Sequence, residues 1–228
     1  MAPTATHTIR TGLFRVAALL VAAVLAGAAS GCNIAGPVAF VLAGPPKTDA
    51  VHKLDGSRPT VIFVDDRANT MPRRSLRVGV GTEAEQTLIA NKVVPQQLMI
   101  ASQAAMHAAA GERHGATMSI AEIGRSVGAE VIIYVTMDAW TLSQDGATLS
   151  PASASRVKIL DVVNNTRIWP DADEGHPLIV RMPSTPEDMP GGAAERNAAH
   201  QALAIATGRQ LARLFFKHGR DALSDQIR

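Results

Sequence analysis

Two continuous apolar runs stand out in the pattern of polar and apolar positions along the chain. Residues 60–64 and 131–135 are rich in β-branched side chains, and each run predicts a strand that is buried in a sheet. Polar and apolar positions then alternate from residue 136 to residue 142. We therefore expect the second strand to continue outward toward solvent.

Further strands are predicted on both sides of this pair. Residues 156–163 and 166–169 predict two strands joined in a hairpin, because the Asn-Asn turn between them tolerates a left-handed backbone. Residues 93–100 predict a short edge strand, since Pro95 cannot donate a central ladder hydrogen bond. The stretch 170–192 contains five prolines and predicts a loop.

Helical periodicity accounts for most of the remaining chain. Four helices are predicted, over residues 75–92, 102–110, 120–127 and 193–218. In the first helix, Thr82 and Glu85 have the spacing of a capping box, which favours a start at Thr82. Ser119 and Glu122 form a second capping box, and Gly128 ends that helix.

The last predicted helix is apolar on two sides. Leu203 and Leu211 lie on one side, whereas Ile205 and Phe216 project from roughly the opposite side. Such a helix either packs between two layers or offers a surface to a partner.

These elements predict a single α/β domain over residues 58–228. We expect an α+β mixed sheet of about four to five strands, three-layer-like, with flanking helices and a long C-terminal helix. The chain has 228 residues, of which 46% are apolar and 18% charged, so it can bury one substantial core. Aromatic residues make up only 4%, which argues against a stacking platform for single-stranded nucleic acid.

The beginning of the chain has the order of a secretory signal. Arg15 precedes an uncharged stretch of 14 residues, 16–29, which is too short to span a bilayer comfortably. Small residues follow, and then comes Cys32, the only cysteine. Residues 1–31 are therefore predicted to be a signal peptide. A single cysteine also excludes an intrachain disulfide and zinc sites that need several thiolates.

The sequence Ala29-Ser30-Gly31-Cys32 resembles the lipobox of bacterial lipoproteins. The resemblance implies that Cys32 is acylated and becomes the new N-terminus, with residues 32–57 as a lipidated tether. Asn33 follows the cysteine, which in enteric-type sorting implies the periplasmic face of the outer membrane. Two alternatives remain open: a plain secretory signal with an incidental cysteine, or an uncleaved anchor that continues to Gly44.

The predicted mature chain carries no net formal charge. Residues 1–31 contain two arginines and no acid, so Lys plus Arg falls from 22 to 20, against 20 for Asp plus Glu. A nucleic-acid footprint is therefore not expected.

Two groups of charged residues are candidates for chemistry. Asp65 and Asp66 follow the first strand and either ligate magnesium or lie in a solvated loop. The densest basic cluster either is solvated or meets an anionic envelope polymer or an acidic partner; it consists of Arg67, Arg73, Arg74 and Arg77. His200 and His218 lie about 27 Å apart on one helix, so they cannot share a metal ion.

The order of elements resembles one group of envelope proteins. The first strand, the run Ile120–Val135 and the hairpin with Val157–Val162 and Thr166–Trp169 carry the resemblance. It is a resemblance to the small α/β domain of the curli-secretion lipoprotein, of the lipoprotein activators of penicillin-binding proteins, and of the Tol translocation protein. It covers about residues 58–218 and transfers no functional residue beyond Cys32.

The resemblance implies a non-catalytic envelope lipoprotein that binds another envelope protein or assembles with itself. We expect no enzymatic activity, no cofactor and no metal. The alternative function is an envelope hydrolase or metal-dependent enzyme that uses Asp65 and Asp66.

Overall fold

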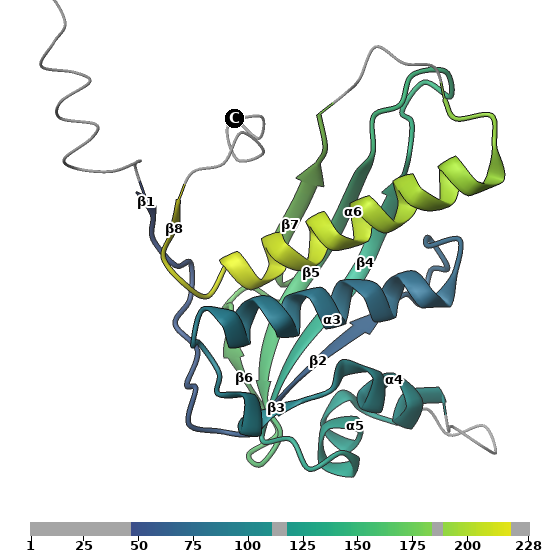
Figure 1. Cartoon of the computed structure of the whole chain (residues 1–228). Coiled ribbons are helices and arrows are strands. Elements are labelled where there is room, and N and C mark those ends of the chain that lie inside the picture. Colours follow the sequence, from purple (N-terminus) through teal and green to yellow (C-terminus); the bar gives the residue numbers. More distant parts are fainter. Residues whose placement is uncertain (1–46, 111–117, 184–188, 220–228) are drawn as a thin grey trace, which may run out of the picture. The chain divides into compact units, whose positions relative to one another are not determined.

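The structure is a computed structural model that describes residues 47–110, 118–183 and 189–219. A six-stranded mixed sheet forms its centre, in the order β3-β2-β4-β5-β6, and β7 also pairs with β5 (Figure 1). The strands of this sheet are β2 (Thr60–Asp65), β3 (Met99–Ile100), β4 (Val131–Thr141), β5 (Ala152–Asp161), β6 (Thr166–Trp169) and β7 (His176–Arg181). Strand β2 runs parallel to β3 and β4, and the remaining pairs are antiparallel.

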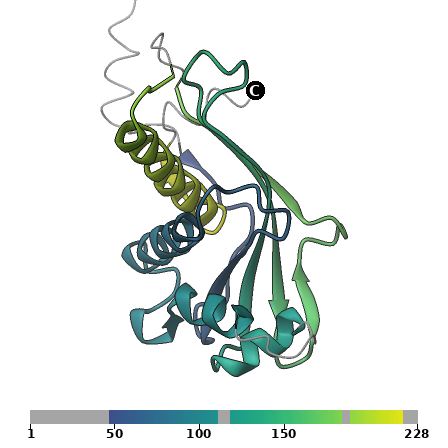
Figure 2. The same ribbon diagram turned by 90° about the vertical axis from the view of Figure 1, so that its right-hand side faces the viewer.

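Helices cover both faces of the sheet, as the predicted three-layer fold requires. They are α3 (Arg74–Ala90), α4 (Ser102–Ala110), α5 (Ile120–Ser126) and α6 (Ala193–Arg213). Figure 2 shows α3 and α6 side by side on one side of the sheet, with α4 and α5 near its lower end. The mixed α/β architecture with a long C-terminal helix is therefore confirmed.

Two apolar clusters separate the layers. Ile62 and Ile133 belong to the cluster beneath α3 and α6, whereas Val61, Phe63 and Ile132 belong to the cluster beneath α4 and α5. Alternate residues of the same strands thus enter opposite clusters, as the two-residue period of a strand requires. The continuous apolar runs in the sequence are explained by this burial on both faces.

Local predictions at two turns and one helix are also confirmed. The Ser119 side chain accepts a hydrogen bond from the Glu122 backbone N–H, and Glu122 accepts one from Ser119 in return. Gly128 and Asn165 have φ values of 77° and 52°, in the left-handed region that these residue types tolerate.

The stretch 170–192 was predicted to be a loop, and this prediction is wrong because it contains β7. Leu178 and Val180 are buried and Ile179 is exposed, so the strand alternates regularly. Pro177 is tolerated because β7 pairs with β5 along one side only, and an edge strand can lose one N–H. This strand raises the main sheet above the four to five strands expected.

Several boundaries also differ from the predictions: α6 ends at Arg213 and not at residue 218, and β5 spans Ala152–Asp161 and not 156–163. Helix α3 begins at Arg74 rather than Thr82, and Glu85 caps α4 instead, because its carboxylate accepts a hydrogen bond from the Ser102 backbone N–H. Of residues 93–100, only Met99–Ile100 pairs with the sheet, after a 3-10 turn over Gln96–Leu98.

Residues 47–57, which the sequence analysis assigns to the tether, lie against the end of α6. Strand β1 (Lys47–Thr48) pairs with β8 (His218–Gly219), and the backbone N–H of Val51 donates to the Leu214 carbonyl at 2.8 Å. The predicted signal peptide, Cys32 and the tether up to residue 46 lie outside the described residues. Among the described helices, none is both long and apolar enough to cross a bilayer.

Close packing of α3 against α6 depends on a glycine. A Cβ atom built on Gly208 of α6 would lie 2.6 Å from the Val80 carbonyl oxygen and 2.8 Å from the Glu83 Cβ. These atoms belong to the α3 backbone and its first side-chain carbon, so they cannot move aside easily.

We expect Gly208→Ala to lower the free energy of unfolding by about 1–3 kcal/mol, because this overlap outweighs the gain in helix propensity. Gly79→Ala is the matched control, since a Cβ there would meet only the Ala204 Cβ at 3.6 Å, an ordinary contact. The control should be neutral or more stable by up to about 1 kcal/mol. Urea unfolding measures both, and equal effects of the two substitutions would contradict the packing argument.

Candidate functional site

Asp65 ends β2 and is engaged by two side chains. Its Oδ2 accepts hydrogen bonds from the Tyr134 hydroxyl at 2.7 Å and from the Arg67 Nε at 2.7 Å. Burial raises the pKa of Tyr134, so the phenol stays protonated and donates to the carboxylate. The interaction joins the end of β2 to Tyr134 within β4.

Asp66 organises the loop that follows. Its Oδ1 accepts from the Thr70 backbone N–H at 2.8 Å and from the Thr70 hydroxyl at 2.9 Å, and its Oδ2 accepts from the Met71 N–H at 3.0 Å. Both aspartates are buried, so neither lies in a solvated loop as one alternative expected. Within the described residues, no group of three His, Cys, Asp or Glu is arranged to hold a metal ion.

The histidines are separated and have individual roles. The Trp140 Nε1 donates a hydrogen bond to the His200 Nδ1 at 3.0 Å, and burial followed by the charge of Arg73 lowers the pKa of His200. His218 lies in β8 beyond the end of α6, not on the helix. Of the predicted basic cluster, Arg67 binds Asp65 and Arg73 donates to the Asn197 side chain, so the cluster is partly used within the fold.

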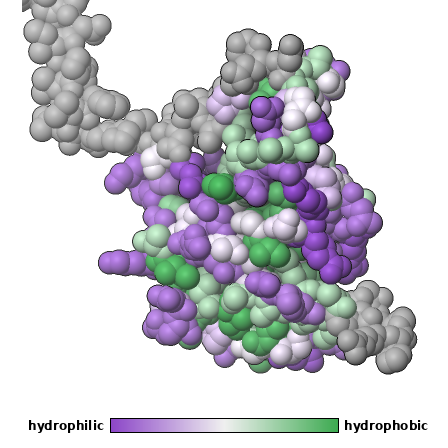
Figure 3. All heavy atoms as spheres, turned by 45° about the vertical axis from the view of Figure 1, so that its right-hand side comes forward, coloured by the Kyte–Doolittle hydropathy of each residue, from purple (hydrophilic) through white to green (hydrophobic). Residues whose placement is uncertain are grey.

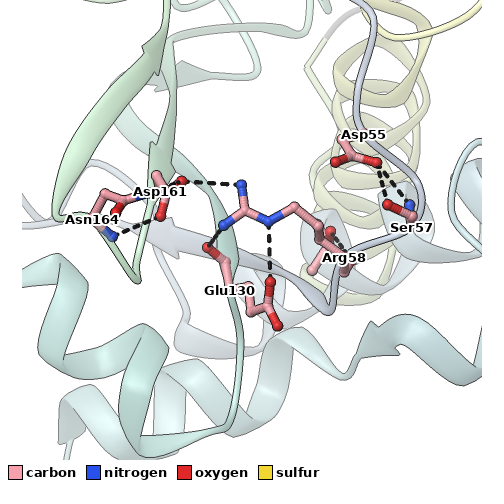
Figure 4. Close-up of polar contacts among 7 residues, drawn as sticks. Asp55, Ser57, Arg58, Glu130, Asp161 and Asn164 are labelled. Atoms are coloured by element: carbon pink, nitrogen blue, oxygen red, sulfur yellow. Dashed lines mark hydrogen bonds and ion pairs between the residues drawn. The ribbon is translucent and has the colours of Figure 1, made fainter.

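A polar group that joins distant segments is centred on Arg58, just before β2 (Figure 4). Its Nε donates to the Glu130 carboxylate at 3.1 Å, and one terminal nitrogen donates to the Asp161 Oδ2 at 3.1 Å. The other terminal nitrogen donates to the Glu130 carbonyl at 3.3 Å. Asp161 also accepts from the Asn164 backbone N–H at 2.8 Å. One guanidinium therefore joins the starts of β2 and β4 to the turn after β5.

The electrostatics of this group follow from its hydrogen bonds. The Arg58 guanidinium, and then the Asn164 N–H, hold the pKa of Asp161 well below its ordinary value. Asp161 is buried and Arg58 is half-buried, so the pair is screened less than a surface pair. This group was not predicted from the sequence, because its members are up to 103 positions apart. The sequence did contain one indication of it. Arg58 precedes β2, Glu130 precedes β4 and Asp161 ends β5, so one base and two acids stand at strand ends that a sheet can bring together.

One face of β5 and β7 is not covered by any described helix. Strands β5 and β7 pair so that Ala154 faces Ile179 and Ala152 faces Arg181 across the ladder. These residues belong to the face opposite to α3 and α6, and Ile179 is 40% exposed. We call this area, with Arg156 and Lys158 of β5, the open sheet face.

Charges on the open sheet face are mainly positive. Arg156 forms two hydrogen bonds to the Asp138 carboxylate, at 2.9 and 2.6 Å. Lys158 and Arg181 form no ion pair within the described residues. The area thus offers an exposed aliphatic side chain on the same face as three cations, of which Arg156 is paired with Asp138.

Other exposed apolar side chains are scattered. Figure 3 shows one face of the molecule, on which apolar residues form small groups between polar ones. On α6, Ile205 is 40% exposed while Leu203 and Leu211 are fully buried. Phe216 is partly buried and follows the end of the helix. The predicted second apolar side of α6 is therefore reduced to Ile205.

We expect Arg58→Met to lower the free energy of unfolding at neutral pH by about 2 kcal/mol, because two acids lose a charged donor. The pKa of Asp161 is lowered in the fold, so its contribution is present above its ordinary value of 3.8 and is lost as the pH falls. The deficit should therefore shrink in acid. Arg167→Gln, which breaks the exposed pair with Asp173, is the control and should change stability by under about 0.5 kcal/mol.

The chain matches no family model and no curated protein. Among solved structures, it is similar to the PelC dodecamer from Paraburkholderia phytofirmans, with 12% identity and a TM-score of 0.38 over 77% of this chain and 97% of that chain. It is also similar to the hypothetical protein CT253 from Chlamydia trachomatis, with 18% identity and a TM-score of 0.35 over 54% and 71%. A third match is the lipoprotein GNA1162 from Neisseria meningitidis, with 8% identity and a TM-score of 0.36 over 65% and 96%.

Similarity of this size assigns neither a fold family nor a function to the chain. The resemblance to the curli-secretion group stays a prediction.

Proposed function

We propose that the protein is a lipid-anchored, non-catalytic module of the bacterial cell envelope that binds another envelope protein or a second copy of itself. The anchor is Cys32, and the binding surface is the open sheet face. The observation that carries the proposal is the exposure of Ile179, two positions from Arg181 on the same face of β7, where no described helix covers β5 and β7.

The anchor is supported by the sequence and by the position of the first described residues. Small residues precede the single cysteine, and the tether enters the domain at β1, which is paired with β8. Several acyl chains on one residue give stable attachment, because each buried methylene contributes roughly 0.8 kcal/mol. A formally neutral mature chain needs this attachment to remain at a membrane.

The charge of the open sheet face indicates the kind of partner. Ile179 provides an apolar contact, and the cations beside it favour a partner surface that carries acids. This combination suits a protein surface better than a small-molecule site, because the exposed side chains lie on a strand and not in a cleft.

The alternative function, a hydrolase or metal-dependent enzyme that uses Asp65 and Asp66, is not favoured by the geometry. Asp66 accepts three hydrogen bonds from its own loop, and Asp65 accepts two from neighbouring side chains. These hydrogen bonds stabilise the end of β2 and the loop after it. They occupy lone pairs of both carboxylates, so fewer lone pairs are available to a metal or a substrate.

Membrane attachment should be lost when Cys32 is changed to Ala. Wild-type protein is expected in the membrane fraction of intact cells, with Cys32 carrying acyl chains in the mass spectrum, whereas Cys32→Ala should leave it. An unmodified thiol behind an intact leader in the native protein would refute the anchor.

A photocrosslinking amino acid at position 179 should capture a partner in intact cells, because Ile179 lies in the proposed contact. The same group at Gln86, an exposed position on α3, is the control and should capture little. Arg181→Glu should reduce crosslinking from position 179 at least severalfold by repelling an acidic partner. A product that forms equally from positions 86 and 179, or one that Arg181→Glu leaves unchanged, would contradict the proposed surface.

A further inference from the structure

A basic pocket lies between the C-terminal ends of α3 and α6 and the strand β8. Its volume is about 370 Å³, and it is lined by Thr87, Asn91, Arg209, Arg213, Phe216, Lys217, His218 and Gly219. Three of these side chains carry a permanent positive charge, and no Asp or Glu is among the lining residues. None of the residues of the open sheet face contributes to it.

Two of the cations are held in place by acids outside the pocket and, among the described residues, keep donors for a further acceptor. The Arg209 Nε donates to the Glu83 carboxylate at 2.6 Å, and the Lys217 ammonium lies 2.8 Å from the Asp49 carboxylate. A guanidinium has five N–H donors and an ammonium has three, so each has donors left for a second acceptor. A phosphate group, with several acceptor oxygens and a negative charge, suits this arrangement.

The pocket lies where the tether enters the domain. In the β1–β8 ribbon, Lys47 is opposite Gly219 and Thr48 is opposite His218, and both partners line the pocket. Cys32 precedes Lys47 by 15 positions. A chain of that length reaches at most about 50 Å when extended, at 3.3–3.6 Å per residue. An acylated Cys32 therefore keeps the pocket within that distance of lipid headgroups, at a high effective concentration.

We propose that the basic pocket binds the phosphate of an anionic phospholipid in the leaflet that holds the tether. This inference rests on the proposed anchoring through Cys32. Headgroup binding would also orient the domain relative to the membrane, because it holds the end of α6 at the bilayer. The open sheet face belongs to the other side of the sheet and stays available to a protein partner.

The pocket cations also stabilise the fold, and the test must distinguish this structural role from binding of a lipid headgroup. Arg213 lies in the last turn of α6, where a cation offsets the negative end of the helix dipole. A purely structural role changes the unfolding temperature, whereas a headgroup site changes binding to anionic lipid while the fold persists.

The test uses the full chain with Cys32→Ala and vesicles of phosphatidylcholine with or without phosphatidylglycerol. Cosedimentation should show tighter binding to the anionic vesicles, and Arg209→Gln should weaken it roughly fivefold, the contribution of one cation near an anionic surface. Glu83→Gln breaks the same ion pair but keeps the cation, so it should bind as well as the parent. Arg125→Gln removes a cation from α5, on the opposite face, and should have little effect.

Equal weakening by Arg209→Gln and Arg125→Gln, or by Arg209→Gln and Glu83→Gln, would overturn the proposal. Inorganic phosphate is the second probe: competition with anionic vesicles supports a phosphate site, whereas an Arg209→Gln defect toward phosphate without one toward vesicles refutes the lipid source. Circular dichroism melting confirms that each variant is folded. These vesicles report on the pocket whether or not native Cys32 is acylated, so failure here leaves the anchor standing.

Discussion

The parallel pair of β2 and β4 is buried on both faces, and the rest of the structure follows from this constraint. A strand with no solvent-facing side needs an apolar layer above and below it, so α3 and α6 cover one face and α4 and α5 cover the other. The helices α4 and α5 are short, with nine and seven residues, and cover β2 and β4. Strands β5 and β7 consequently have one covered face and one open face, and their side chains alternate between buried and exposed.

This difference between central and peripheral strands explains which elements the sequence could predict. Apolar runs at residues 60–64 and 131–135 identify strands buried on both sides without any tertiary information. Strand β7 has only Leu178 and Val180 to mark its covered face, and Pro177 interrupts its pattern. Its register is determined by pairing with residues of β5 that lie 19 to 29 positions earlier. Local periodicity cannot supply that information, and the predicted loop in its place is the consequence.

A capping interaction was predictable only where it is local. Ser119 and Glu122 cap their own helix, and the sequence contains everything that the contact requires. Glu85 has the same spacing from Thr82, but its carboxylate binds the N-terminus of α4 in space. The same distinction applies to the candidate sites. The acidic pair at 65 and 66 was visible in the sequence, whereas its buried, internally bonded state depends on Tyr134 and Thr70.

The Arg58 group is important because a chain with a single cysteine cannot form an intrachain disulfide. If Cys32 is acylated, the mature chain enters an oxidising compartment without a free thiol, so no disulfide stabilises it. Cross-links between distant segments must then be noncovalent. Arg58 joins the starts of β2 and β4 to the turn after β5, and it does so with three hydrogen bonds from one rigid guanidinium. The group therefore supports the sheet at the end opposite to Asp65.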